Sequence, residues 1–314
     1  MKTLDIVTSA HNEEGNITEL YDDLKKTLDF ETDYQWKLII TDNGSTDRTW
    51  DEIFELCAKY PNIEGLKLSK DFGFEGAIKA GLDLSNADAI VIMTSDLQDS
   101  PTEIPKFLRE FENGFDNVYQ IVSSRPDSTL LRKINSGVFY WLAYTLSDGQ
   151  IPKNVSEFRL ISKRLNEAMK SFPERNRFLR GIVSWTGYRS KGIPFSRQPR
   201  RHGKSKAFSK HVFKLGVKGI LVNSYSPLNM VAVLGAIMSG LSFLLTAVFS
   251  SIWLTSGTPF AGFGILVGIN LLGFGLVMLA LGVMSQYLAL VYEEQKRRPS
   301  YLIMDRAGKS ISNP

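Results

Sequence analysis

The sequence contains few of the residues that build disulfides and transition-metal sites. Among its 314 residues there are one cysteine, Cys57, and three histidines. A single cysteine excludes an internal disulfide and a cysteine-based metal cluster, which agrees with a reducing compartment. The histidines show no spacing typical of zinc ligands, so zinc chemistry is not expected.

Charge is absent from one long stretch. Residues 219–292, a run of 74 positions, contain no Asp, Glu, Lys, Arg or His. A membrane-spanning helix needs about 20 apolar residues, so this stretch predicts two, near Leu228–Leu254 and Phe263–Leu290. The helix-breaking segment 255–259 predicts the turn between them. A buried helical hairpin of a soluble protein is the alternative, but such helices rarely lack every charge.

Acidic residues are absent from the segment before this stretch. Residues 175–218 contain 13 Lys and Arg and no acid, whereas residues 1–174 contain 19 Lys and Arg and 30 Asp and Glu. Four lysines recur every four residues: Lys206, Lys210, Lys214 and Lys218. This stripe predicts a helix lying on an anionic membrane surface, and nucleic acid is not expected as a partner. Basic residues flank both ends of the uncharged stretch, which predicts that both flanks face the cytoplasm.

The first half of the chain alternates short β-branched runs with helical patterns. The expected strands are 4–9, 37–41, 65–69, 89–94 and 118–123, and the expected helices are 15–28, 46–60, 73–86 and 102–113. This alternation predicts an α/β fold, with a mostly parallel sheet and helices on both of its faces. In such sheets, ligands bind beyond the carboxyl ends of the strands.

Polar residues follow each of the first four expected strands, in segments 10–16, 41–47, 70–73 and 95–99. A nucleotide sugar needs groups that neutralise its diphosphate and groups that accept hydrogen bonds from its base and ribose. Asp96 and Gln98 offer oxygen ligands for a divalent cation. Asp42 and the turn containing Asn12 and Glu14 offer acceptors. Helix capping is the alternative role for acids in such loops.

Seven motifs, taken in order, resemble glycosyltransferase family 2. Within it they resemble the polyprenyl-phosphate glycosyltransferases, the group of dolichyl-phosphate mannose synthase and the bacterial undecaprenyl-phosphate glucosyl- and aminoarabinosyl-transferases. The motifs are 12–14, 42–49, 68–73, 96–101, 157–160, 176–181 and 201–206. The resemblance implies a GT-A (Rossmann-like) fold and an inverting displacement by a lipid phosphate. A phosphomonoester with a second pKa near about 6 is already largely anionic at neutral pH, so positioning and charge neutralisation must supply most of the catalysis.

The resemblance also implies roles for individual residues. The implied catalytic residues are Glu157, Asp96 and Arg159, with Asp96 and Gln98 holding Mg or Mn. The implied contacts of a UDP- or GDP-type sugar are Asn12, Glu14, Asp42, Lys70, Gly76, Arg201, Ser205 and Lys206. Arg177, Arg180 and Arg200 are the candidates for the acceptor phosphate, because guanidinium groups match phosphate in a bidentate manner.

Three positions depart from the family pattern. Thr94 stands where the first acid of an Asp-x-Asp motif is usual, so a metal would lose one carboxylate. Glu157 replaces an aspartate, and Asn43 replaces the second of two aspartates after the second expected strand. These departures predict an unusual donor sugar or reduced activity, and they leave the use of a metal open.

The expected organisation has four parts. They are a cytoplasmic GT-A domain over 1–200, a basic loop with an interfacial amphipathic helix over 201–226, a transmembrane hairpin over 227–292, and a cytoplasmic tail over 293–314 that is loosely ordered after Arg298. Small residues in the spans permit a homo-oligomer.

The expected function is sugar transfer to undecaprenyl or dolichyl phosphate at the cytoplasmic face of the plasma membrane, giving a lipid-linked sugar for modification of cell-envelope glycans. One alternative is a glycolipid synthase acting on a lipid hydroxyl, which needs Glu157 as a general base. The other is a non-catalytic membrane partner that retains the fold.

Overall fold

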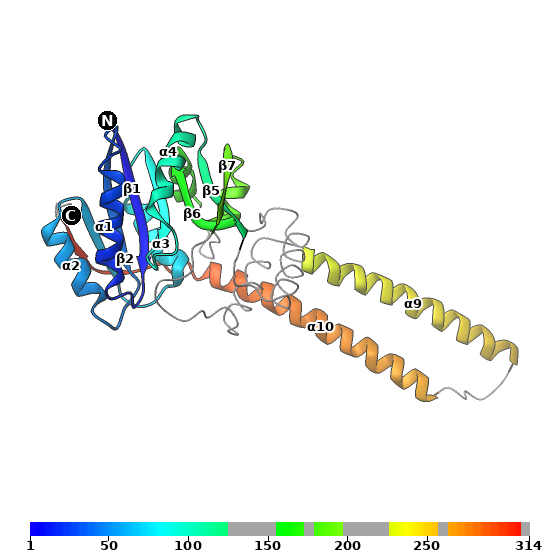
Figure 1. Cartoon of the computed structure of the whole chain (residues 1–314). Helices are drawn as coiled ribbons and strands as arrows, with labels where there is room; N and C mark the ends of the chain where they lie inside the picture. The colour runs from blue at the N-terminus through cyan, green and yellow to red at the C-terminus, as the bar shows by residue number, and fades with distance from the viewer. Residues whose placement is uncertain (125–154, 173–178, 197–225, 257–262, 309–314) are drawn as a thin grey trace.

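The computed structural model describes residues 1–124, 155–172, 179–196, 226–256 and 263–308. They form an α/β domain from which two long helices extend side by side (Figure 1). The strands are β1 (Lys2–Ala10), β2 (Tyr34–Asp42), β3 (Ile63–Leu68), β4 (Ala89–Thr94), β5 (Asn117–Ser124), β6 (Val155–Ser162), β7 (Ser190–Ser196) and β8 (Ile303–Ala307). The helices are α1 (Asn16–Leu28), α2 (Thr49–Lys59), α3 (Gly73–Leu84), the 3-10 turn η1 (Pro101–Glu103), α4 (Ile104–Glu112), α6 (Lys163–Lys170), α7 (Leu179–Trp185), α9 (Ser226–Ser256) and α10 (Phe263–Gln295).

The described strands form one sheet in the order β7-β5-β6-β4-β1-β2-β3-β8. The pairs β1–β2, β1–β4 and β2–β3 are all parallel, so the carboxyl ends of these four strands meet at one edge. Strand β6 is antiparallel to both β4 and β5, and β8 is antiparallel to β3. The parallel arrangement expected for the first four strands is confirmed, while the sheet as a whole is mixed.

Helices cover both faces of this sheet, as the alternation predicts. Helices α1, α2 and α4 pack on one face through side chains such as Leu24, Ile53 and Phe107. Helices α3, α6 and α7 pack on the other through side chains such as Ile78 and Ile182. Because the central strands are buried on both faces, β4 is a nearly continuous apolar run instead of an alternating one, while β1 also contains the buried polar residues Asp5 and Thr8.

Helices α9 and α10 match the expected membrane spans. Both are long and apolar enough to cross a membrane, over Leu228–Ile252 and Ile269–Gln295, and neither segment is buried against the described residues. Side chains this apolar need an environment other than water. The boundaries expected for the four parts stay predictions, and the expected interfacial helix at 201–226 falls almost entirely outside the described residues.

The end of the chain corrects one expectation. The sequence predicts a loosely ordered tail after Arg298, but β8 pairs with β3 as the edge strand of the sheet. Tyr301 and Ile303 pack against a small apolar cluster that includes Leu68 and Ala77, and Ala307 is buried. The tail is ordered because it covers an edge of β3 that no other described strand pairs with, which a reading of local sequence does not reveal.

Candidate active site

The carboxyl ends of β1, β2 and β4 bring the expected polar segments together. Ala10 pairs with Asp42, and Ser9 pairs with Thr94. The Asn43 backbone N–H donates to the Ala10 carbonyl at 2.8 Å, and the Ser95 hydroxyl donates to the Ser9 carbonyl at 2.9 Å. We call this place, where the strands β1, β2, β3 and β4 end, the strand-end edge.

Asp42 lies fully buried at the strand-end edge. Its Oδ1 accepts a hydrogen bond from the Ser45 backbone N–H at 3.0 Å. Its Oδ2 is buried and has no hydrogen-bond partner among the described residues. A buried acceptor without a partner costs free energy, so this oxygen is suited to a ligand that brings an N–H or O–H donor.

Asn43 joins two loops of the edge, and this explains one departure from the family pattern. Its Nδ2 donates to Asp71 Oδ1 at 2.7 Å, while its Oδ1 accepts from the Phe72 backbone N–H at 2.8 Å. An amide can donate and accept at once, whereas an ionised carboxylate only accepts. An aspartate in place of Asn43 would therefore face the Asp71 carboxylate without a proton between them.

Gly44 allows these two loops to touch. Its φ is +69°, a left-handed conformation that favours glycine. A Cβ at this position would lie 2.5 Å from the carbonyl carbon of Lys70. The Lys70 ammonium lies 5.1 Å from the centroid of the Phe72 ring, so this predicted contact of the nucleotide sugar belongs to the turn beside Asp42.

Asn12 and Glu14, which the sequence predicts to contact the donor, fasten the turn after β1 to the loop before α2. Asn12 Oδ1 accepts from the Thr46 backbone N–H at 2.8 Å. The Glu14 carboxylate accepts from the Arg48 backbone N–H at 3.4 Å. These contacts place both residues at the strand-end edge, and their contact with a nucleotide stays a prediction.

The end of β4 joins one hydroxyl to two carboxylates. Thr94 Oγ1 lies 2.7 Å from Asp96 Oδ1 and 2.9 Å from Asp99 Oδ2. The hydroxyl has one hydrogen, so only one carboxylate can receive it in full. Leu97 has a φ of +57°, and this turn brings the buried Asp99 back to Thr94. Sequence reasoning did not single out Asp99 as a site residue.

The oxygens of Thr94, Asp96 and Asp99 are hard ligands of the kind that Mg and Mn prefer. Within the described part of the chain, however, no group of three or more His, Cys, Asp or Glu side chains is placed to hold a metal ion. Gln98 is buried. Its backbone N–H donates to Asp96 Oδ1 at 3.3 Å. These residues suit a divalent cation whose remaining ligands come from a diphosphate.

Strand β6 brings Glu157 to the same edge. Ile92 pairs with Arg159 in the antiparallel ladder. Continuing this register by two residues, forward on β4 and backward on β6, brings Thr94 and Glu157 to the same level. Arg159 is almost fully buried; its Nη2 donates to the Ser156 carbonyl at 3.2 Å and lies 3.9 Å from Glu157 Oε2. The predicted catalytic residues Glu157, Arg159 and Asp96 therefore belong to one region of the sheet.

The remaining predicted site residues are placed only in part. Arg180 follows Leu179 at the start of α7, and the Leu179 backbone N–H donates to the Glu75 carboxylate at 3.3 Å, which fastens this start to the first turn of α3. Gly76 is buried in α3, and a Cβ there would lie 3.0 Å from the Ser300 carbonyl oxygen. Five predicted residues lie outside the described residues: Arg177, Arg200, Arg201, Ser205 and Lys206.

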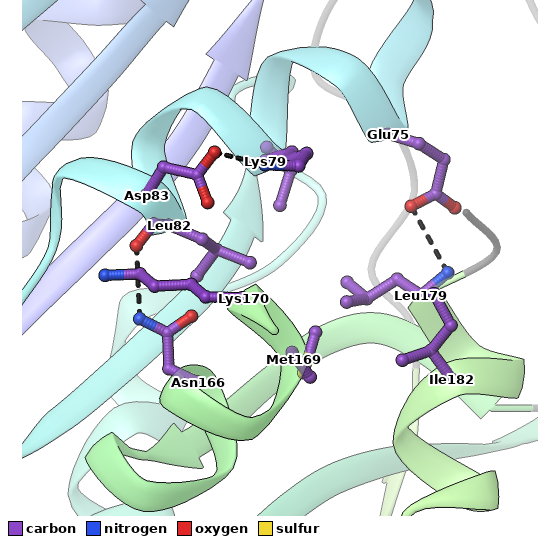
Figure 2. A pocket seen from close by; sticks show the side chains of 10 residues that line it. Glu75, Lys79, Leu82, Asp83, Asn166, Met169, Lys170, Leu179 and Ile182 are labelled. Atoms are coloured by element: carbon purple, nitrogen blue, oxygen red, sulfur yellow. Dashed lines mark hydrogen bonds and ion pairs between the residues drawn. The ribbon is translucent and has the colours of Figure 1, made fainter. Parts of the chain in front are cut away.

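A hollow between α3, α6 and α7 lies on one helical face of the sheet (Figure 2). Lys79 and Asp83 form an ion pair within α3. Asn166 Nδ2 on α6 donates to the Leu82 carbonyl of α3 at 3.1 Å, which ties these two helices together. Lys170 Nζ donates to the Ser85 carbonyl at 2.8 Å, and burial lowers the pKa of this lysine. These contacts serve helix packing, and the reactive groups gather at the strand-end edge instead.

Comparison with known proteins identifies the family. The family model described as glycosyl transferase family 2 matches residues 5–170. This chain belongs to glycosyltransferase family 2. The resemblance expected from the motifs is thereby confirmed, and the chain is a glycosyltransferase with the GT-A fold and two apolar carboxyl-terminal helices.

Two relatives match this family-2 glycosyltransferase over nearly its whole length. An uncharacterized glycosyltransferase of Bacillus subtilis, YkcC, is 33% identical over 303 residues, which cover 96% of this chain and 94% of the relative. The bactoprenol glucosyl transferase of Shigella phage SfV is 32% identical over 307 residues, which cover 98% and 99%.

Among solved structures, a mannosyltransferase of Pyrobaculum calidifontis in complex with GDP-Man and Mn2+ is similar to this glycosyltransferase. The TM-score is 0.45 with 14% identity, and the match covers 91% of this chain and 86% of that one.

Proposed function

We propose that this glycosyltransferase moves a sugar from a nucleoside diphosphate donor to a polyisoprenyl phosphate, undecaprenyl or dolichyl phosphate, at the cytoplasmic face of the plasma membrane. The observation that carries the donor half of the proposal is the buried Asp42 Oδ2, which lacks a partner among the described residues. It lies at the edge where α/β sheets of this kind bind ligands.

The geometry around Asp42 favours uracil as the base. Uracil presents one N–H between two carbonyl groups, whereas guanine presents two adjacent donors that suit both oxygens of a carboxylate. Asp42 Oδ1 already accepts the Ser45 backbone N–H, whereas Oδ2 has no partner among the described residues, so one unoccupied oxygen faces the ligand and matches one N–H donor. A UDP-sugar therefore matches this site better than a GDP-sugar.

The acceptor half of the proposal is supported by the distance between the apolar helices and the strand-end edge. Helix α10 ends at Gln295, and the Ser300 carbonyl already lies against Gly76 in the first turn of α3. Five residues span at most about 18 Å. If α9 and α10 cross a membrane, the site therefore lies close to its surface, where a lipid phosphate can reach it.

The name of the phage relative, a bactoprenol glucosyl transferase, supports the same class of acceptor. The start of α7, which carries Arg180, is tied to the first turn of α3. This backbone contact supports Arg180 as a candidate for binding the acceptor phosphate.

In the proposed reaction, an acceptor phosphate oxygen attacks the anomeric carbon and the bond from that carbon to the nucleoside diphosphate breaks, with inversion. The acceptor is already anionic, so no base has to remove a proton. Asp96, with Thr94 and Asp99 beside it, would hold a divalent cation, which neutralises the diphosphate leaving group when bound. The buried Arg159 orients Glu157, whose carboxylate fixes the geometry of the acceptor. The product would be a lipid-linked sugar for modification of cell-envelope glycans.

The test of the donor site is binding of UDP and GDP to the purified protein in detergent, measured by calorimetry. The wild type should bind UDP more tightly than GDP, and Asp42→Ala should lose that preference because it removes the acceptor that distinguishes the bases. Equal binding of both nucleotides by the wild type would contradict the assignment of Asp42.

The test of the acceptor class is Glu157→Gln. An anionic phosphate acceptor needs no general base, so this variant should keep transfer to a polyisoprenyl phosphate within about tenfold of the wild-type rate, which is less than the roughly 10²- to 10⁴-fold that general-base catalysis contributes. A loss of roughly 10³-fold or more, on the order of what a general base supplies together with orientation, would favour a lipid hydroxyl as acceptor.

A further inference from the structure

The segment that follows α10 returns to the strand-end edge and contacts the turn Ser69–Gly73, which we call the donor turn. The Ser69 backbone N–H donates to the Leu302 carbonyl at 3.0 Å. The Tyr301 hydroxyl donates to Asp83 Oδ2 on α3 at 2.9 Å, and the Lys79 ammonium lies 5.4 Å from the Tyr301 ring centroid. The tail is thus fastened both to the donor turn and to the helix that follows it.

The loop after β2 holds the same turn from its other side. The Asn43 side chain donates a hydrogen bond to Asp71 and accepts one from the Phe72 backbone N–H. Gly44 lies against the Lys70 backbone so closely that a Cβ would overlap it. The donor turn therefore lies between the loop that directly follows Asp42, the last residue of β2, and the tail that leaves α10.

The tail docks through a short strand at the edge of the sheet. Strand β8 has five residues and pairs with one strand, β3, among the described strands, and their ladder shifts register between Lys67 and Leu68. Leu302 and Met304 are 52% and 70% exposed. Short edge strands with exposed side chains belong to the parts of a fold that open first.

We propose that Tyr301 and Leu302 are positioning residues for donor binding, so that the affinity for the nucleotide depends on the docking of the tail that follows α10. This inference rests on the proposed function, because it takes Asp42 and Lys70 as parts of the nucleotide site. Linkage requires the reverse effect as well: nucleotide bound at the strand-end edge stabilises the docked tail. The chain after the apolar hairpin is in this way a part of the donor site.

The first experiment measures hydrogen–deuterium exchange of the full chain in detergent, with and without UDP. Exchange should slow in peptides from the donor turn and, to a comparable degree, in peptides covering 299–307. A peptide from the opposite end of the sheet, such as the start of β5, serves as the internal reference and should not change.

The second experiment compares two substitutions in the tail by UDP calorimetry. Tyr301→Phe removes only the hydroxyl that binds Asp83, and it should weaken UDP binding by up to roughly 10- to 100-fold, the effect of one hydrogen bond to a charged group. Met304→Ala, on the exposed side of β8, is the matched control and should leave UDP binding unchanged. Melting temperatures of both variants show that the fold is retained.

The outcomes separate the inference from the proposed function. If UDP binds and slows exchange in the donor turn alone, and Tyr301→Phe binds UDP as the wild type does, the tail has no positioning role while the donor site stands. If the folded wild type binds no nucleotide at all, the proposed function fails and the inference fails with it.

Discussion

Replacement of Asn43 by aspartate tests how the donor turn is held. The substitution restores the residue usual in the family, yet it removes the N–H that donates to Asp71 and leaves two carboxylates about one hydrogen-bond length apart. The introduced carboxylate can still accept from the Phe72 backbone N–H, so the change isolates a single contact. The prediction is therefore opposite to what family likeness alone suggests.

The magnitude follows from two contributions. A hydrogen bond to a charged group contributes about 1.5–3 kcal/mol. Two unit charges 4 Å apart near a protein surface repel by about 4 kcal/mol at most, and because Asp71 is exposed, solvent screening reduces this to about 1 kcal/mol. Together the attachment of the donor turn should weaken by about 3 kcal/mol, which corresponds to a loss of UDP affinity of up to about 100-fold.

The assay is UDP calorimetry on Asn43→Asp, Asp71→Asn and the double variant. Asp71→Asn keeps an acceptor oxygen for Asn43 and should cost little. The double variant places a donor on residue 71 opposite the new carboxylate and should regain most of the lost affinity. If Asn43→Asp binds UDP as tightly as the wild type, or if the double variant is no better than Asn43→Asp, the Asn43 contact does not position the donor turn.

Three further predictions concern other parts of the domain. Thr94→Val removes the hydroxyl between Asp96 and Asp99, so half-maximal transfer should need more Mg than in the wild type, while Thr94→Ser should behave normally; a Val variant with an unchanged Mg dependence would contradict the role of the hydroxyl. Burial raises the pKa of the Cys57 thiol to about 12, so the native protein should not react with a thiol reagent at pH 8 and the unfolded protein should react once per chain; rapid labelling of the native protein would show that Cys57 is accessible. The backbone N–H and hydroxyl of Thr3 hold the pKa of Asp88 below its ordinary value of 3.8, so this carboxylate stabilises the fold above pH 3.8 and the contribution disappears as the pH falls through its lowered pKa. The difference in melting temperature between the wild type and Asp88→Asn should accordingly shrink on acidification from pH 7 to pH 3, and a constant difference would refute the assignment.

The sequence predicts the first part of the fold well because local pattern and tertiary packing agree there. Strand β4 occupies the expected residues 89–94, and α9 and α10 contain both expected spans. The strand β8 escapes prediction because its five residues become a strand only through pairing with β3, more than 200 residues earlier in the chain. Long-range pairing of this kind leaves little trace in local periodicity.

The candidate site shows the same division. Residues at or just beyond the ends of strands, such as Asp42 and Asp96, are predictable, because parallel strands deliver their carboxyl ends to one edge. The role of Asn43 in joining two loops is not predictable from the sequence, because its partner Asp71 lies on another loop 28 residues away. The contact of Asp99 with Thr94 is equally unpredictable from the sequence, since it depends on the left-handed conformation of Leu97.

The most direct measurement of the central claim is transfer by the full chain in detergent with Mg, with UDP-sugars as donors and with undecaprenyl phosphate, dolichyl phosphate or diacylglycerol as acceptor. Mass spectrometry of the lipid fraction reads out the product. We predict a sugar linked to a polyisoprenyl phosphate, formed together with UDP, and no product on diacylglycerol. A glycosylated diacylglycerol, or folded protein that binds UDP and glycosylates neither class of lipid with any donor, would contradict the account.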